Sequence, residues 1–184
     1  MGGVTGEGRS GRLHYTLIAE RSAVLLDVST SLGPVAFGAT GLEGFVDATV
    51  GDKGIDTGQS PGAHLELPVN RLTSGNAAYD GEFRRQLNTR RFPTAYVDLV
   101  GVVPMDGDSR TFRVSGELSL RGVTVPVEGV VMAELTDPGA MVVSGEETLD
   151  IRAFGIPPPS LFMIKIDPEI KLRLHLEARA ETGW

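Results

Sequence analysis

Apolar and polar residues alternate along most of the chain, which is the pattern of β-strands that bury one face and expose the other. The clearest alternations cover residues 112–120 and 170–179, where almost every second residue is apolar and the residues between them are polar or charged. Weaker versions begin at residue 13 and recur at 24–28, 65–69, 94–102, 123–134 and 142–151. The pattern predicts an all-β fold of about eight strands.

One segment follows a different period and predicts a short helix. Between residues 76 and 90, Tyr79, Phe83 and Leu87 recur at every fourth position, which places them on one face of a helix. Asn76 is suited to cap the N-terminus of this helix. The Phe92-Pro93 pair then returns the chain to extended structure, because the residue before a proline avoids the α region.

The connections between the predicted strands favour an antiparallel sheet. Arg121-Gly122 reads as a two-residue hairpin turn in which the glycine adopts a positive φ. Pro68 cannot donate to a ladder, so it predicts a sheet edge or a bulge. Strands without alternating helices indicate a barrel or sandwich, and about eight strands is the size at which a closed barrel either fills with side chains or holds one small ligand.

The length of 184 residues fits a single domain, which we place at residues 13–180. Residues 1–12 are rich in glycine and polar side chains and are expected to form a flexible leader, and residues 181–184 a short C-terminal tail.

The formal net charge of −7 argues against nucleic acid as a partner and disfavours an anionic membrane surface. With no cysteine, the chain has no disulfide, thiolate nucleophile or cysteine-bound metal. No apolar run approaches the roughly 18 residues of a transmembrane helix, and the first residues lack the apolar core of a secretory signal. We therefore expect a cytoplasmic protein, or a periplasmic or secreted one if an export signal was trimmed from this chain.

Residues with catalytic potential are few and scattered. His14, His64 and His175 lie on predicted strands without metal-ligand spacing, and neither a hydrolase nucleophile elbow nor a phosphate-binding loop follows a strand. The sequence therefore predicts neither an enzyme nor a metal site, although a barrel that serves as a substrate pocket stays open as a minor alternative.

Four motifs, in order along the chain, carry a resemblance to a known family. They are RVSGELSLRGVTVPVEGV at residues 113–130, LTSGN followed by an aspartate at residues 72–80, FPT at residues 92–94, and TLDIRAFGI at residues 148–156. The chain resembles, over about residues 13–180, the YceI family of lipocalin-like, polyisoprenoid-binding proteins. The resemblance implies a closed antiparallel barrel with a helix over it, which encloses the tail of an isoprenoid quinone, polyprenol or similar lipid and has no catalytic residues or other cofactor.

The chain departs from the family pattern at four positions. Thr30 stands where the family often has histidine after the second strand, and Tyr79 where it has arginine before the helical aspartate. Ile151 and Ala153 likewise replace an arginine and an aspartate. These replacements remove groups that could contact a ligand head group, whereas an apolar tail site would survive them, so a different apolar ligand stays open.

The leading hypothesis is a non-catalytic carrier whose ligand contacts the inward apolar residues of the barrel. The candidate lining consists of Leu26, Phe83, Val97, Val114, Leu118, Phe154, Phe162, Leu172 and Leu174. The alternative is a structural or interaction protein with a filled barrel and no small-molecule ligand, for which the stiff Pro157-Pro158-Pro159 loop is the best support. A homodimer also stays open.

Overall fold

The computed structural model describes residues 11–105, 107, 110–137, 139–157, 160–161 and 163–181. Strands dominate, as the alternation predicted. The strands are β1 (Gly11–Leu17), β2 (Ala23–Thr30), β3 (Gly33–Thr40), β4 (Glu43–Gly51), β5 (Gly54–Asp56), β6 (Gly62–Leu67), β7 (Ala95–Pro104), β8 (Thr111–Leu120), β9 (Val123–Asp137), β10 (Ala140–Asp150), β11 (Ser160–Leu161) and β12 (Ile164–Ala180). The helices are α1 (Ala77–Leu87) and the short 3-10 turns η1 (Ala19–Arg21), η2 (Thr57–Gln59), η3 (Val69–Arg71) and η4 (Ile151–Phe154).

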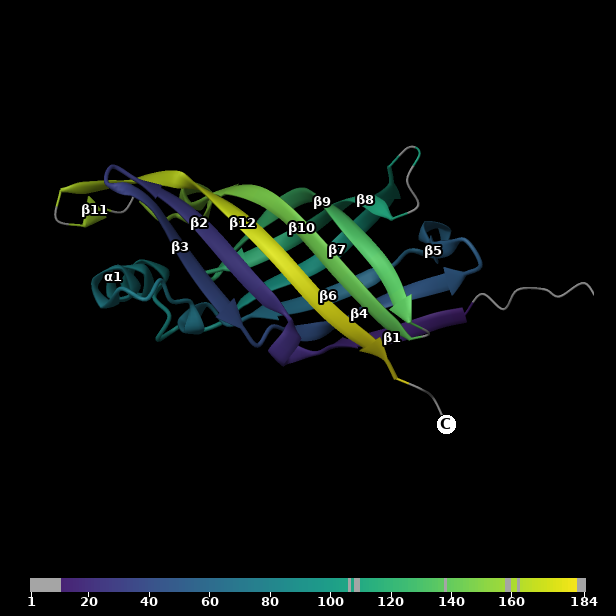
Figure 1. Ribbon diagram of the computed structural model, residues 1–184. Coiled ribbons are helices and arrows are strands. Elements are labelled where there is room, and N and C mark those ends of the chain that lie inside the picture. The colour runs from purple at the N-terminus through teal and green to yellow at the C-terminus, as the bar shows by residue number, and fades with distance from the viewer. Residues whose placement is uncertain are drawn as a thin grey trace, which may run out of the picture.

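The sheet closes on itself as an antiparallel barrel, which confirms the predicted fold class. Its eight wall strands follow the order β1, β4, β6, β7, β8, β9, β10 and β12, and pairing of β1 with the end of β12 completes the ring. The β2–β3 hairpin extends the wall by pairing with the first part of β12, while β5 and β11 add short edges to β4 and β12. Figure 1 shows the strands running obliquely along an elongated barrel.

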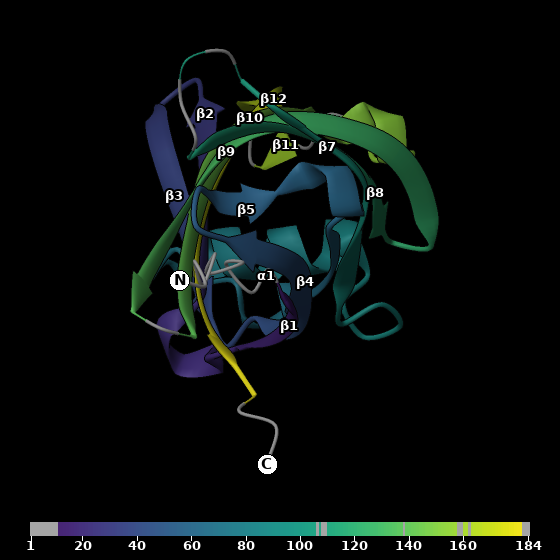
Figure 2. The same ribbon diagram turned by 90° about the vertical axis from the view of Figure 1, so that its right-hand side faces the viewer.

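Different elements cover the two ends of the barrel. The helix α1 lies across one end, together with β11 and the turn between β2 and β3 (Figure 1). Figure 2 looks into the opposite end, where β5 lies in front and α1 is seen behind the ring of strands. We call these the helix end and the β5 end.

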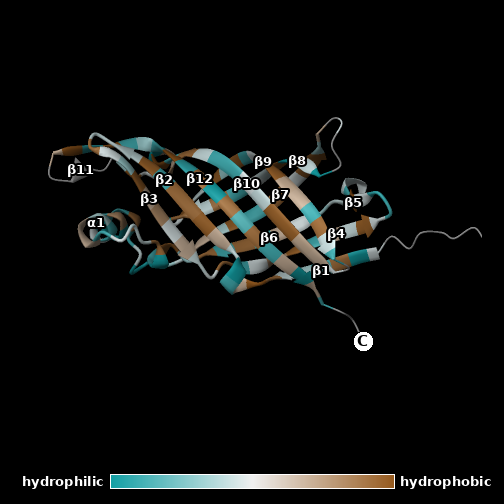
Figure 3. Cartoon of the chain, in the orientation of Figure 1, coloured by the Kyte–Doolittle hydropathy of each residue, from teal (hydrophilic) through white to brown (hydrophobic). Residues whose placement is uncertain are grey.

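The alternation along the strands separates an apolar interior from a polar exterior. In β12, for example, Ile170, Leu176 and Ala178 are buried, whereas Lys171 and Arg173 are exposed. Figure 3 shows the resulting bands of hydrophobic and hydrophilic residues along the strands. The arrangement follows from the pleat, which turns successive side chains to opposite faces of a sheet.

The predicted hairpin turn is confirmed. Arg121 and Gly122 have φ angles of 54° and 75° and join β8 to β9 without further loop residues. Positive φ at both central positions defines a type I′ turn, whose twist matches that of the flanking strands.

The helix is confirmed at its start and ends earlier than predicted. The Asn76 side chain accepts hydrogen bonds from the N–H groups of Ala78 and Tyr79, as expected of an N-cap. The helix stops at Leu87, because Asn88 takes a left-handed conformation with φ of 50°. The chain is therefore already out of helix before it reaches Pro93.

Four strands were missed by the sequence reasoning, namely β3, β4 and the short β5 and β11, and Pro68 lies outside a strand. Residues 33–40 and 43–51 form β3 and β4 although they contain glycines, which weaken strand propensity. One of these, Gly44, is required by packing, because a Cβ there would lie 2.0 Å from the carbonyl oxygen of His64 on β6. Pro68 follows the end of β6 and starts η3, so it interrupts no ladder.

Candidate ligand-binding cavities

Two apolar cavities lie end to end inside the barrel. The first, which we call the mouth cavity, borders α1 at the helix end and holds about 100 Å³ of free space. The second, the deep cavity, extends toward Ile55 of β5 and holds about 170 Å³. Successive inward residues of one strand line first one and then the other, as with Leu118 and Val114 on β8 and Leu172 and Leu174 on β12. The two cavities thus share one axis along the barrel.

The structure places eight of the nine candidate lining residues on the walls of these cavities. Leu26, Phe83, Leu118, Phe154 and Leu172 line the mouth cavity, and Val97, Val114 and Leu174 line the deep cavity. Phe162 lies outside the described residues. Contact of these side chains with a ligand stays a prediction.

Several inward side chains are less buried than a packed core would make them. Leu26, Val97, Leu172 and Leu174 keep part of their surface accessible, and each of them lines one of the cavities. Interiors of folded proteins normally reach crystal-like packing density and leave few voids larger than a water molecule. Incomplete burial of leucines and valines on the inner face therefore marks space that side chains do not fill.

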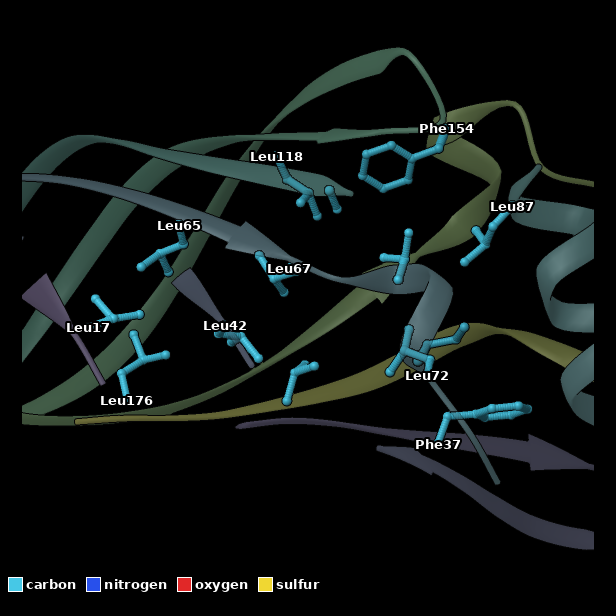
Figure 4. Packing of buried hydrophobic residues seen from close by; sticks show 14 of the residues in the cluster. Leu17, Phe37, Leu42, Leu65, Leu67, Leu72, Leu87, Leu118, Phe154 and Leu176 are labelled. Atoms are coloured by element: carbon cyan, nitrogen blue, oxygen red, sulfur yellow. The ribbon is translucent and has the colours of Figure 1, made fainter. Parts of the chain in front are cut away.

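Other apolar residues of the barrel are tightly packed around this space. Figure 4 shows Leu67, Leu118 and Phe154 directed from separate elements toward a shared interior, with Leu87 approaching from α1. Leu118 is 6% exposed and Phe154 is 2% exposed, so these two belong to the packed part of the wall. The interior thus consists of tightly packed residues, which we call the frame, around an axis along which side chains leave free space.

A buried carboxylate fixes the start of α1 over the mouth cavity. Asp80 accepts hydrogen bonds from the Thr73 hydroxyl at 2.6 Å and from the hydroxyl and N–H of Ser74 at 2.6 and 2.7 Å. Burial alone would raise the pKa of Asp80, but these bonds, with the nearby charge of Arg84, outweigh it and hold the pKa below its usual value. The LTSGN segment and its aspartate therefore have a structural role, because their hydrogen bonds hold the start of α1 in place.

Three polar residues of α1 are among those that line the mouth cavity. Tyr79, Glu82 and Gln86 line it beside the apolar ring of Phe83. Glu82 accepts a hydrogen bond from Arg85 at 2.6 Å and another from Gln86 at 2.9 Å, and these bonds lower the pKa of its carboxyl. The surface of the mouth cavity is almost entirely apolar, so a ligand would meet the carbon atoms of these side chains there, and apolar side chains deeper in the barrel as well.

The TLDIRAFGI segment closes the wall where β9 and β10 stop pairing. The ladder between these strands ends at Glu146 and Val130, and η4 follows β10 with its Ile151 and Phe154 side chains buried. Asp150 caps η4 through the N–H of Arg152 and pairs with its guanidinium at 2.7 Å. The aspartate and arginine of this motif therefore serve local structure, while its apolar residues line the mouth cavity.

Three of the four positions at which the chain departs from the family pattern line the mouth cavity. They are Thr30, Tyr79 and Ile151, whereas Ala153 is exposed and lines neither cavity. The Thr30 hydroxyl donates to the carbonyl of Gly33 at 2.6 Å within the β2–β3 turn. The replacements thus fall on the wall that a ligand would touch.

The histidines lie on the outer face of the barrel, away from both cavities. His14 pairs with Asp47 and His64 with Asp98, each at 2.6 Å, and His175 is also exposed. Their neighbours along the strands, such as Leu65 and Leu174, point inward. Within the described part of the chain, no three histidine or acidic side chains are grouped to hold a metal ion.

Sequence reasoning missed several lining residues because they come from undetected elements or from polar positions. Phe37 lies on β3, and its ring stacks on Phe83 with centroids 4.5 Å apart. Glu82 and Gln86 line the mouth cavity although they are polar. Their spacing of three and four residues from Tyr79, Phe83 and each other was the available signal, since it puts them on the same helix face.

These features define the class of protein: a closed antiparallel, lipocalin-like β-barrel with an apolar interior and a helix over one end. The chain belongs to the YceI family, because the model of the YceI-like domain matches residues 15–178. No curated protein matches it. Among the described residues, no helix has the length and apolar character needed to cross a bilayer.

Solved structures of low sequence identity share the fold. BcnA from Burkholderia cenocepacia superposes with a TM-score of 0.73 at 15% identity, over 88% of this chain and 98% of its own. A polyisoprenoid-binding domain from Saccharophagus degradans, implicated in plant cell wall breakdown, gives a TM-score of 0.67 at 16% identity, over 92% and 99% of the two chains. The YceI protein of Campylobacter jejuni gives 0.59 at 11% identity, over 77% and 82%.

Proposed function

We propose that the protein is a non-catalytic carrier that holds one elongated apolar molecule along the barrel axis, such as an isoprenoid quinone or a polyprenol. The observation that carries the proposal is the pair of apolar cavities on one axis, with leucine and valine side chains left partly uncovered between the packed frame residues. The polyisoprenoid-binding domain that shares the fold supports the same class of ligand.

The free volumes place a condition on this function. Pockets for small molecules usually hold about 300–1,000 Å³, whereas the two cavities hold about 100 and 170 Å³. A long lipid therefore enters only if side chains of the wall move apart. The partly buried side chains, including Phe83 on α1, make fewer contacts than the frame residues and are the ones expected to move.

The same small volumes favour the second candidate, a structural or interaction protein with a filled barrel. The proline loop does not decide between the two, since Pro158 and Pro159 lie outside the described residues. The uncovered inner side chains are the reason to prefer the carrier.

Mass spectrometry of an organic extract from purified protein gives the first test, because a carrier is expected to retain isoprenoid lipid. The second test is thermal unfolding with and without a long-chain quinone. A ligand present at about 100 times its Kd stabilises the native state by about 2.7 kcal/mol, which shifts Tm by about 5–11 °C for a domain of this size. An empty extract together with an unchanged Tm would reject the carrier and leave the filled barrel.

A further inference from the structure

Two large apolar side chains project into solvent at the helix end of the barrel. Leu32, in the turn between β2 and β3, is 76% exposed, and Met163, just before β12, is 98% exposed. Their turns lie side by side, because the N–H of Ser31 donates to the carbonyl of Lys165 at 2.9 Å and the N–H of Lys165 donates to the Ser31 hydroxyl at 3.1 Å. Figure 1 shows both turns at the same end as α1.

These tips stand at the entrance of the mouth cavity. Thr30 and Val35 flank the turn that carries Leu32, and Ile166 follows Met163 on β12; all three line the mouth cavity. Single exposed apolar residues are common on protein surfaces. Two of the most exposed apolar side chains, on adjacent turns at the opening of an apolar cavity, are instead placed to enter an apolar phase outside the protein.

The same end carries four arginines on α1 and the segment after it, in a chain whose net charge is −7, and the exposed carboxylates of Asp167 and Glu169 lie on the first part of β12. Arg84, Arg85, Arg90 and Arg91 follow one another along the last turn of α1 and the segment after it, and all four are exposed. Among the described residues, no carboxylate pairs with Arg90 or Arg91, and the Arg91 guanidinium lies 5.2 Å from the Phe92 ring centroid.

Two of these arginines have acidic partners on the helix, since Arg85 forms a salt bridge with Glu82 and Arg84 lies near Asp80, so the positive charge without such a partner is that of Arg90 and Arg91. Asp80 is 6% exposed and is held by Thr73 and Ser74, and the Glu82 carboxylate is turned to Arg85 and Gln86 with 13% of its side chain exposed. Charges farther away are screened over about 10 Å at ordinary salt. The net charge of the whole chain therefore does not describe this rim.

We propose that this rim, formed by Leu32, Met163, Arg90 and Arg91, docks on an anionic phospholipid bilayer. The apolar tips enter the interface while the guanidinium groups meet phosphate and acidic head groups, the two contributions that hold peripheral proteins on membranes. Docking in this pose turns the mouth cavity toward the lipid. The inference rests on the proposed carrier function in one respect: it supplies a path by which an apolar ligand passes between bilayer and barrel without crossing water.

Flotation of the purified chain with vesicles that contain no isoprenoid tests the docking separately from ligand binding. Vesicles of phosphatidylcholine and phosphatidylglycerol in equal parts are compared with vesicles of phosphatidylcholine alone. We expect binding to the anionic vesicles that falls steeply with added salt. The double variant Arg90→Gln/Arg91→Gln should lower partitioning by about 25-fold, since each basic residue near an anionic surface strengthens binding about five-fold. The double variant Leu32→Ser/Met163→Ser should lower it by at least about ten-fold.

Matched control variants at the β5 end carry the same chemical changes. Arg12→Gln/Arg179→Gln removes two exposed arginines from β1 and β12, and Val103→Ser/Met132→Ser removes two exposed apolar side chains from β7 and β9. Full binding by these controls supports docking through the rim. The docking proposal is overturned if the parent does not bind anionic vesicles, or if the rim and control variants lose vesicle binding equally. It is also overturned if the rim binds a second copy of the protein instead of lipid.

Titration with a soluble short-chain quinone, without vesicles, keeps the two proposals apart. Vesicle binding through the rim without quinone binding would support the docking and reject the carrier. Quinone binding without vesicle binding would support the carrier and reject the docking.

Discussion

Replacing Leu172 by alanine tests whether the axis of the barrel is a cavity wall or a packed core. Leu172 lines the mouth cavity and keeps part of its surface accessible. Leu42 is the matched control, because it is also an interior leucine but is 0% exposed and lines neither cavity. The same deletion is thus made at a wall and in the frame.

The expected costs differ because the two side chains lose different amounts of packing. Leucine to alanine removes the equivalent of about three methylene groups, and at about 0.8 kcal/mol each the transfer loss for Leu42 is about 2.4 kcal/mol. The void left behind adds about 24 cal/mol per Å³ that the neighbours fail to fill, which brings Leu42→Ala into the usual range of about 2–5 kcal/mol. Leu172→Ala deletes atoms that already border free space, so we expect it to cost less than about 2 kcal/mol.

Urea unfolding of the ligand-free protein measures both costs, and fluorescence titration with a long-chain isoprenoid quinone measures binding. Leu172→Ala should weaken quinone binding while it spares stability, and Leu42→Ala should do the opposite. Equal losses of stability in the two variants, together with no quinone binding by the parent, would refute the cavity-wall interpretation and favour the filled barrel.

Three further predictions address the frame around the cavities. Gly122→Val should destabilise the fold by about 1–3 kcal/mol, because valine resists the positive φ of the turn. Gly122→Asn should cost less, because asparagine tolerates that conformation. If the two variants had equal denaturation midpoints, the positive φ would not be the cause of the destabilisation. Asp80→Asn should cost about 1.5–3 kcal/mol above pH 4. Because the folded-state pKa of Asp80 is lowered, the parent should lose this advantage as pH falls below 4, and a gap that persists in acid would contradict the assignment. Leu118→Glu should abolish quinone binding. It should also destabilise the protein more at pH 7 than at pH 4, because burial raises the pKa of the introduced carboxyl. A loss of stability that does not change with pH would mean that the side chain reaches water.

The docking proposal differs from the expectation drawn from a count of charges along the sequence. The net charge of −7 disfavours an anionic membrane surface, but that number averages over the whole barrel, including the end opposite α1. Folding buries or pairs Asp80 and Glu82 while it leaves the neighbouring arginines exposed. A charge per residue is a property of the sequence, whereas a charged surface is a property of the fold.

Local rules determined much of this protein directly from the sequence. A period of two gave the strands of residues 112–120 and 170–179, a period near four gave the helix of Tyr79, Phe83 and Leu87, and a capping residue and a glycine marked one helix start and one turn. Each of these depends on neighbours within a few positions, because backbone geometry sets the direction of successive side chains.

Only the tertiary structure decided which side chains face each other across the barrel. Alternation showed that Leu118 and Leu172 lie on apolar faces, yet not that both line one cavity or that Leu118 is nearly fully buried while Leu172 keeps part of its surface accessible. That difference depends on how β8, β12 and α1 surround the mouth cavity, and these elements are more than 20 residues apart in the chain. The adjacency of the two turns that carry Leu32 and Met163 arises in the same way, because packing, unlike periodicity, depends on distant parts of the chain.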